Sequence, residues 1–322
     1  MTIGFSKTDL KSKKEIRNKI EGYIEDYISR FSELSIYTEE EIIHIVLSAI
    51  RSNEGEVISV GVSRGRENYN LDVERVENWL RERVIPNTVQ IKTDEVDLLK
   101  LIVFSLAMPY KMLKGETRAT MTEKTRRTKK RDFEQIFSDT FIGKIGEIAF
   151  RKFVKQKFDM EIALDWDIST AIGTFKSDII GSKEIVSIKS TDTLEGIWAE
   201  AQRPANYGIF VKVAMPKDFF MKILAHISSL RKLLNYVGER LDKDDNISSL
   251  LKFVEQAAYE EEMNIKAYVC GYFATSEDSL KPKGLELPFL GEVHEDKHLL
   301  ECSKLKYSTA DWKQFFSIVL PQ

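Results

Sequence analysis

The chain has 322 residues, of which 43% are hydrophobic and 31% charged, and its formal net charge is -3. This length can bury a sizeable core in one large domain or two modest ones. Because the two signs of charge nearly cancel, the whole chain is not a polycation, and any affinity for nucleic acid has to come from a local patch.

Two further features bear on where the protein works. The amino terminus turns polar and basic at once, and no apolar run approaches the length of a membrane span, so neither secretion nor membrane insertion is expected. The two cysteines, Cys270 and Cys302, lack the paired spacing of a zinc knuckle. We therefore expect a soluble protein of a reducing compartment, the cytoplasm.

The first third of the chain, residues 1–110, is predicted to be a mainly helical subdomain with a small β element. Apolar residues at helical spacing predict helices over 8–34, from Thr38 onward, over 71–86 and over 94–113, with an interruption at Pro109 and a strand-like run at 55–70. His44 lies in an apolar run and is interpreted as a structural histidine. No convincing helix-turn-helix pattern is present, so a DNA-recognition role here would depend on position alone.

A basic connector follows at residues 111–131, where positive charges far outnumber negative ones and apolar residues are few. Such a segment can contact phosphates and release their condensed counterions, and it can equally be a solvated linker. Its position directly before the next segment favours nucleic-acid binding. The residues expected to contact phosphates are Arg118, Lys124, Arg126, Arg127, Lys129, Lys130 and Arg131.

The segment from Asp139 to Lys189 brings two acids and a lysine together. A long helix from Asp132 carries Glu147 among apolar residues, with Gly143 and Gly146 as small positions for close approach of another backbone. A carboxylate in such a place needs a metal, a lysine or another donor as partner. The alternative is a simple ion pair, for example with Arg151 at i+4.

Three short strands are expected to follow this helix. They cover residues 160–167, 175–180 and 184–190, and the last two are joined by a turn at Gly181-Ser182. The turn should bring Asp178 close to Lys189. Because alternate residues of a strand share a face, Ser187 and Lys189 should point one way and Ile188 toward the core.

This combination suits phosphodiester hydrolysis. A divalent cation polarises the phosphate and lowers the pKa of an attacking water, and Mg²⁺ needs only one or two carboxylates with carbonyls and waters. A neighbouring lysine can orient the water or stabilise the developing charge.

The residues GEIAF, then SD, then SIK resemble the PD-(D/E)XK nuclease superfamily, best known from type II restriction endonucleases. A predicted helix at 194–202 and strand at 207–216 complete the αβββαβ order of that superfamily. The resemblance implies an α/β, restriction-endonuclease-like core with a mixed central sheet flanked by helices, within a catalytic domain of residues 132–322. By the same resemblance Asp178 binds the metal, Lys189 is the motif lysine, and Glu147 is the extra acid of the first helix.

The sequence departs from this pattern at Ser187, which occupies the (D/E) position. Some members of the superfamily recruit a glutamate from elsewhere, usually from the following helix. Glu200 and Glu195 are the carboxylates on that predicted helix. We favour Glu147 as the compensating acid, with Glu200 next. Ser187 would then be structural or hydrogen-bonded to the attacking water.

The resemblance implies a Mg²⁺-dependent endonuclease acting on double-stranded DNA, most simply a type II restriction enzyme working as a homodimer. The metal would be held by Asp178, Glu147 and a main-chain carbonyl near Ile188. Two alternatives stay open. One is a nuclease fold that binds DNA without cutting it, and the other is a repair or resolvase-type nuclease of the same superfamily.

Beyond the core, helices are predicted over 216–241, from Leu250, and over 309–320 with Thr309 as a cap, and a strand over 264–275. His226 lies among apolar residues and is interpreted as structural. His294 to His298 spell HEDKH, which matches the HExxH zinc-protease pattern. Its surroundings indicate a loop and short strands instead of a helix, so no zinc is expected.

Overall fold

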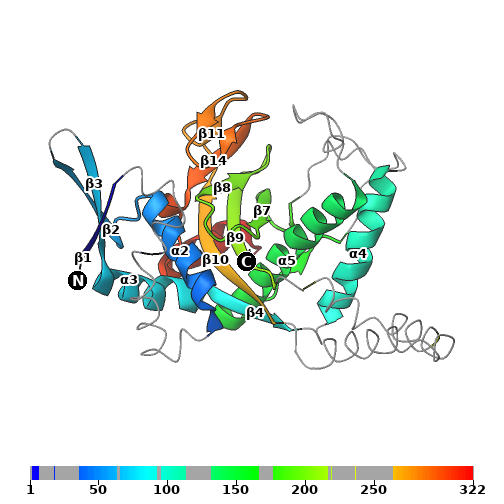
Figure 1. Ribbon diagram of the computed structural model, residues 1–322. Helices are drawn as coiled ribbons and strands as arrows, with labels where there is room; N and C mark the ends of the chain where they lie inside the picture. Colours follow the sequence, from blue (N-terminus) through cyan, green and yellow to red (C-terminus); the bar gives the residue numbers. More distant parts are fainter. Residues whose placement is uncertain are drawn as a thin grey trace.

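The computed structural model describes residues 2–6, 18, 36–63, 66–92, 96–113, 132–166, 177–216, 219, 236 and 264–321. Within these residues the protein is a mixed α/β structure (Figure 1). Its main sheet has four strands in the order β4-β10-β9-β7, with bounds Thr88–Lys92, Asn264–Ala274, Tyr207–Ala214 and Val186–Thr191. Strands β7 and β9 run parallel, whereas β9, β10 and β4 pair antiparallel. The predicted strands at 207–216 and 264–275 are confirmed.

One face of the sheet is covered by the long helix α5 (Phe133–Phe158) and the last helix α9 (Thr309–Val319). Asp132 caps α5, because its side chain accepts a hydrogen bond from the Gln135 amide at 3.0 Å. Trp312 of α9 is fully buried, with its ring 5.4 Å from that of Phe153 on α5. The predicted helix at 309–320 is confirmed, but Ser308 caps it instead of Thr309.

The other face of the sheet is covered by α2 (Glu39–Arg51), which packs with Phe210, Tyr268 and the buried Cys270. Thr38 begins α2 with a capping box completed by Glu41, as its position before three glutamates predicts.

The run at 55–72 forms β2 (Ile58–Ser63) and β3 (Arg66–Asp72), which make a three-stranded sheet with β1 (Thr2–Ser6). The following helix, α3, covers Val73–Trp79, and single turns of π and 3-10 helix extend it to Asn87. Strand β4 comes next and was not predicted. Its five residues pair with β10, far along the chain, so the first third contributes a strand to the main sheet.

A second three-stranded sheet overturns the predicted helix at 194–202. Residues Trp198–Ala201 form strand β8, which pairs with β14 (Lys297–Glu301), and β14 pairs in turn with β11 (Leu280–Lys281). Burial alternates along β8, as expected of a half-buried strand. Leu, Glu and Ala favour a helix locally, but pairing with a strand about a hundred residues later outweighs that preference. Glu195 and Glu200 therefore do not lie on a helix.

Several smaller differences concern element lengths. The two strands before β7 are only two residues each, β5 (Ala163–Leu164) and β6 (Ile179–Ile180). Helix α4 (Val96–Leu113) continues through Pro109, where an interruption was expected. The predicted helices over 8–34, 216–241 and from Leu250 lie outside the described residues, apart from Asn18, Phe219, Tyr236 and residues next to β9. Among the described helices, none is long and apolar enough to cross a membrane.

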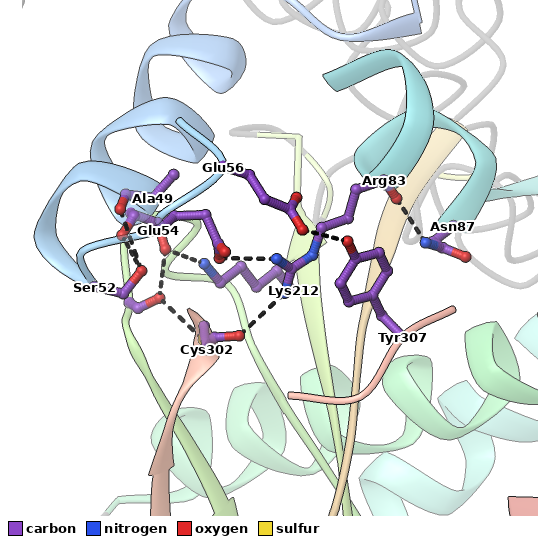
Figure 2. Close-up of polar contacts among 11 residues, drawn as sticks. Ala49, Ser52, Glu54, Glu56, Arg83, Asn87, Lys212, Cys302 and Tyr307 are labelled. Carbon is purple, nitrogen blue, oxygen red and sulfur yellow. Dashed lines mark hydrogen bonds and ion pairs between the residues drawn. The ribbon is translucent and has the colours of Figure 1, made fainter. Parts of the chain in front are cut away.

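A buried ion pair in the first third of the chain contacts the segment that follows β14 (Figure 2). Arg83 and Glu54 are both buried, with 2.8 Å between Nη1 and Oε2, and Arg83 Nη2 donates to the carbonyl oxygen of Cys302 at 3.1 Å. The Arg83 guanidinium also lies 3.9 Å from the ring centre of Tyr307. Burial is the main cause that raises the pKa of Glu54 to about 7, against the attraction of Arg83. This cluster fixes the α3 region, α2 and the chain after β14 in one arrangement.

Candidate active site

Four of the five predicted catalytic residues line one cleft of about 630 Å³. They are Glu147 from α5, Asp178 from the residue before β6, Lys189 from β7 and Glu200 from β8. Ile188 lines it too, and so does Gln202, which the sequence did not single out. Four successive parts of the chain therefore deliver three acids and a lysine to one cavity.

Ser187 does not line this cleft. Its exposed fraction is 0%, and its hydroxyl accepts a hydrogen bond from the main-chain amide of Gln202 at 3.4 Å. Ser187 and Lys189 share Gln202 as a hydrogen-bond partner, as expected of residues that point one way from β7, but Ser187 is buried whereas Lys189 lines the cleft. Its surroundings agree with the structural role that was one of the two considered.

Asp178 is held against β7 by main-chain hydrogen bonds. Its amide donates to the carbonyl of Val186 at 2.9 Å, and its carboxylate Oδ2 accepts from the amide of Ile188 at 2.6 Å. Gly181 supplies the left-handed residue of the intervening turn, with φ of 76°. Ser177 Oγ accepts from the Val186 amide at 3.1 Å, which fixes the same register. The expected proximity of Asp178 to Lys189 is supported, because both line the cleft and the Asp178 carboxylate binds the amide of the residue before Lys189.

Glu147 is buried and its partner is Lys144, one helical turn earlier. Lys144 Nζ donates to Glu147 Oε2 at 2.7 Å and also to the main-chain carbonyl of Asp165. The ammonium lies 4.9 Å from the ring centre of Phe104 and 5.1 Å from that of Trp166. The aromatic rings and the carbonyl confine Lys144, so Glu147 is held in place from one side.

Close contact between α5 and β7 places Glu147 over the strand. A Cβ atom added to Gly146 would lie 2.4 Å from Ser190 Cβ and 2.6 Å from its Oγ, so only glycine fits. Ser190 Oγ donates to the carbonyl of Ile142 on α5 at 2.7 Å. The predicted close approach is confirmed at Gly146, but it is wrong at Gly143, where an added Cβ would meet nothing within 4 Å.

Burial disfavours the charged forms of both Glu147 and Asp178. Burial, followed by repulsion from Asp178, raises the pKa of Glu147 to about 8, although Lys144 and Lys189 act in the opposite direction. Burial likewise raises the pKa of Asp178, against the hydrogen bond from Ile188 and the charges of Lys189 and Lys144. A buried acid, Glu147, and a half-buried acid, Asp178, both with raised pKa values, would be stabilised in their charged forms by an added positive charge.

Lys189 and Glu200 each have a polar partner on the β8 side of the cleft. Lys189 Nζ donates to Gln202 Oε1 at 3.1 Å, which directs the ammonium across the cleft. Glu200 Oε2 accepts from Lys297 Nζ of β14 at 2.9 Å. Gln202 lies two residues after Glu200, so the spacing of a strand would have indicated it.

Glu195 lies elsewhere. It lines a second cleft, of about 730 Å³, at the start of α2, together with His44 and Asp192. Its Oε2 lies 3.2 Å from His44 Nδ1 and 3.7 Å from Arg51 Nη1. Glu195 is therefore removed from the candidates for the missing acid, and His44 has the structural partner that was expected.

The cleft offers oxygen donors to a metal ion. Among the described residues, no group of three or more His, Cys, Asp or Glu side chains is arranged to hold a metal ion. Asp178, Glu147 and the Ile188 carbonyl are oxygen donors, and Mg²⁺ commonly keeps several waters and takes one or two carboxylates.

The HEDKH segment has no helical geometry. His294 lies in a loop and His298 in β14, where its Nδ1 is 2.9 Å from Ser279 Oγ. The expected loop and short strand are confirmed for this segment.

The basic connector lies almost wholly outside the described residues. This applies to all seven predicted phosphate contacts, namely Arg118, Lys124, Arg126, Arg127, Lys129, Lys130 and Arg131.

Comparisons of this chain with protein-family models, with curated proteins and with solved structures found no match.

Proposed function

We propose that the protein is a Mg²⁺-dependent endonuclease that hydrolyses phosphodiester bonds in double-stranded DNA. The observation that carries the proposal is the shared cleft of Glu147, Asp178 and Lys189, in which Asp178 is fixed to β7 by the Ile188 amide. Two acids with raised pKa values, Glu147 and Asp178, with a lysine beside them, suit a site that binds a cation and a phosphate together.

Each residue has a separate role in this proposal. Asp178 and Glu147 would hold the cation with the Ile188 carbonyl, and the cation would neutralise phosphate charge and lower the pKa of a water. Lys189, oriented by Gln202, donates a hydrogen bond to the attacking water or to a phosphate oxygen that gains charge. Ser187 supports the contact between β7 and the chain after β8.

Glu147 is our choice for the acid that replaces the one missing at position 187. Its charge interacts with those of both Asp178 and Lys189, and Gly146 holds it close to β7. Glu200 is second, because it lines the cleft but is already paired with Lys297.

The order α5-β5-β6-β7-β9 supports a restriction-endonuclease-like core, with β8 in place of the expected helix. A type II restriction enzyme acting as a homodimer in the cytoplasm is the specific form we propose. The basic connector and the first third of the chain would supply its contacts to the DNA.

One observation favours the DNA-binding rival without catalysis. Lys144 already neutralises Glu147, and a buried serine occupies the acidic motif position. That rival predicts a gel shift with duplex DNA and no cutting in Mg²⁺ or Mn²⁺.

The test is incubation of purified protein with plasmid DNA in Mg²⁺ and in excess chelator. The proposal expects linear or nicked products only with the metal, and uniform ends on sequencing if the enzyme is a restriction endonuclease. Binding without any cutting would replace it with the rival, and a strong preference for branched or nicked DNA would indicate a repair or resolvase-type nuclease.

A further inference from the structure

Part of the lining of the candidate active site is an exposed apolar turn. Strands β12 (Glu286–Leu287) and β13 (Gly291–Glu292) pair antiparallel, and Pro288, Phe289 and Leu290 connect them. Phe289 and Leu290 have exposed fractions of 50% and 46%, yet both line the cleft of Asp178 and Lys189. Large apolar side chains that stay exposed in a cleft often mark an interaction surface, so we expect the ligand to bring an apolar group to this turn.

The turn is held rigidly in an unusual conformation. Phe289 has φ of 62°, a region that bulky residues rarely occupy, and Gly291 follows with φ of 83°. Trp198 Nε1 of β8 donates to the carbonyl of Pro288 at 2.8 Å. Strand β8 also carries Glu200, so the tip is anchored to the element that forms the cleft.

A positive charge adjoins the aromatic ring. The guanidinium of Arg51, at the end of α2, lies 4.8 Å from the ring centre of Phe289, while half of the Phe289 surface stays exposed. Arg51 also lies 3.7 Å from Glu195, so the exposed part of the Phe289 ring, a flat apolar surface on which a nucleotide base can stack, is the feature that fits DNA.

We propose that the turn of Pro288, Phe289 and Leu290, here called the wedge, inserts between base pairs beside the cleaved phosphate and unstacks them. This rests on the proposed nuclease function and deepens it, because it names the substrate as duplex DNA opened at the cleavage step. An apolar side chain inserted at such a position disrupts base stacking, which costs free energy. The DNA bends as a result and gains further contacts with the protein. DNA that is already distorted at that step avoids the cost.

The binding test needs no catalysis. Wild-type protein in chelator is titrated with a fluorescent duplex that is intact or carries one central mismatch, and the expected preference for the mismatch is about tenfold. Phe289→Ala should lose that preference, because stacking of one base on an aromatic ring contributes about 10- to 100-fold in affinity. Phe289→Trp should keep it, and so should Leu285→Ala, a control 38% exposed on the same hairpin but outside the cleft lining.

The cleavage test uses the same substrates with Mg²⁺. Phe289→Ala should cut the intact duplex about 10- to 100-fold more slowly than wild type and lose much less on the mismatched duplex. Equal binding of both duplexes by the wild type, or an equal loss on both in Phe289→Ala, would overturn the wedge. So would a change of oligomeric state in Phe289→Ala without a change in duplex preference, because the turn would then contact a second copy. Absence of all cleavage with the mismatch preference intact would refute the nuclease proposal and leave the wedge standing.

Discussion

Replacing Gly146 by alanine tests how Glu147 is positioned. The added Cβ would lie 2.4 Å from Ser190 Cβ, so α5 must move away from β7 or the strand must yield. Overpacking of this kind costs about 1–3 kcal/mol. Alanine in place of glycine inside a helix contributes about 1 kcal/mol in the opposite direction.

Gly143→Ala is the matched control, because it lies on the same helix and its Cβ would meet nothing within 4 Å. Both variants gain the same helix stability, so the difference between their free energies of unfolding isolates the clash. We expect Gly146→Ala to be less stable than Gly143→Ala by about 1–3 kcal/mol in urea denaturation.

A compensating change makes the test sharper. Ser190→Gly removes the side chain that Gly146→Ala would strike, so the double variant should be more stable than the sum of the single changes by about 0.5–3 kcal/mol. The shift of α5 in Gly146→Ala should also weaken Mg²⁺-dependent cleavage by about 10- to 100-fold, because small misplacements of reacting groups are costly. Equal stability of Gly146→Ala and Gly143→Ala would refute the argument that this contact sets the position of Glu147.

Two further predictions follow from the charged groups. The pKa of Glu147 is raised from 4.5 to about 8, so the folded protein keeps this proton longer than the unfolded chain does, and metal-free stability should fall as pH rises from about 4.5 to about 8. Calorimetric Mg²⁺ titrations should show tighter binding at pH 8 than at pH 6, with proton release at pH 6, and Glu147→Gln should remove both pH dependences. Arg83→Met should destabilise the protein by about 3–5 kcal/mol at pH 8, because Glu54 loses its buried partner, and by less at pH 5, where Glu54 takes up a proton. The exposed Arg81→Met is the control, and equal losses of denaturation stability in the two variants would contradict the role of the buried pair.

The elements that the sequence predicted well are those with strong local signals. Strands β9 and β10 are nearly continuous apolar runs. Thr38 and the three glutamates after it indicate the start of α2. Asp178 and Lys189 could be brought together from the sequence because a short turn of residues 181–185 links their strands. Glu147 could be added to this pair because helical periodicity placed it among packed residues and Gly146 indicated close approach of another backbone.

The elements that the sequence did not predict correctly depend on pairing partners far along the chain. Strand β8 has helix-favouring residues, and its pairing with β14 could not be deduced from residues 194–202. Strand β4 is too short to stand out, and only β10 defines it. The same long-range packing buries Ser187 and brings Gln202 to Lys189. Phe289 could not have been identified, because nothing local connects the β12–β13 turn with the cleft.

Cleavage of one plasmid in Mg²⁺ by wild-type protein and by Asp178→Asn is the measurement that tests the central claim most directly. The substitution keeps the size of the side chain and an oxygen that can accept the Ile188 hydrogen bond, so the fold should be retained, which circular dichroism checks. We predict Mg²⁺-dependent cutting by the wild type and none by Asp178→Asn, with Asp192→Asn at the rim of the same cleft remaining active. Cutting by a folded Asp178→Asn at the wild-type rate would contradict the assignment of this cleft as the active site.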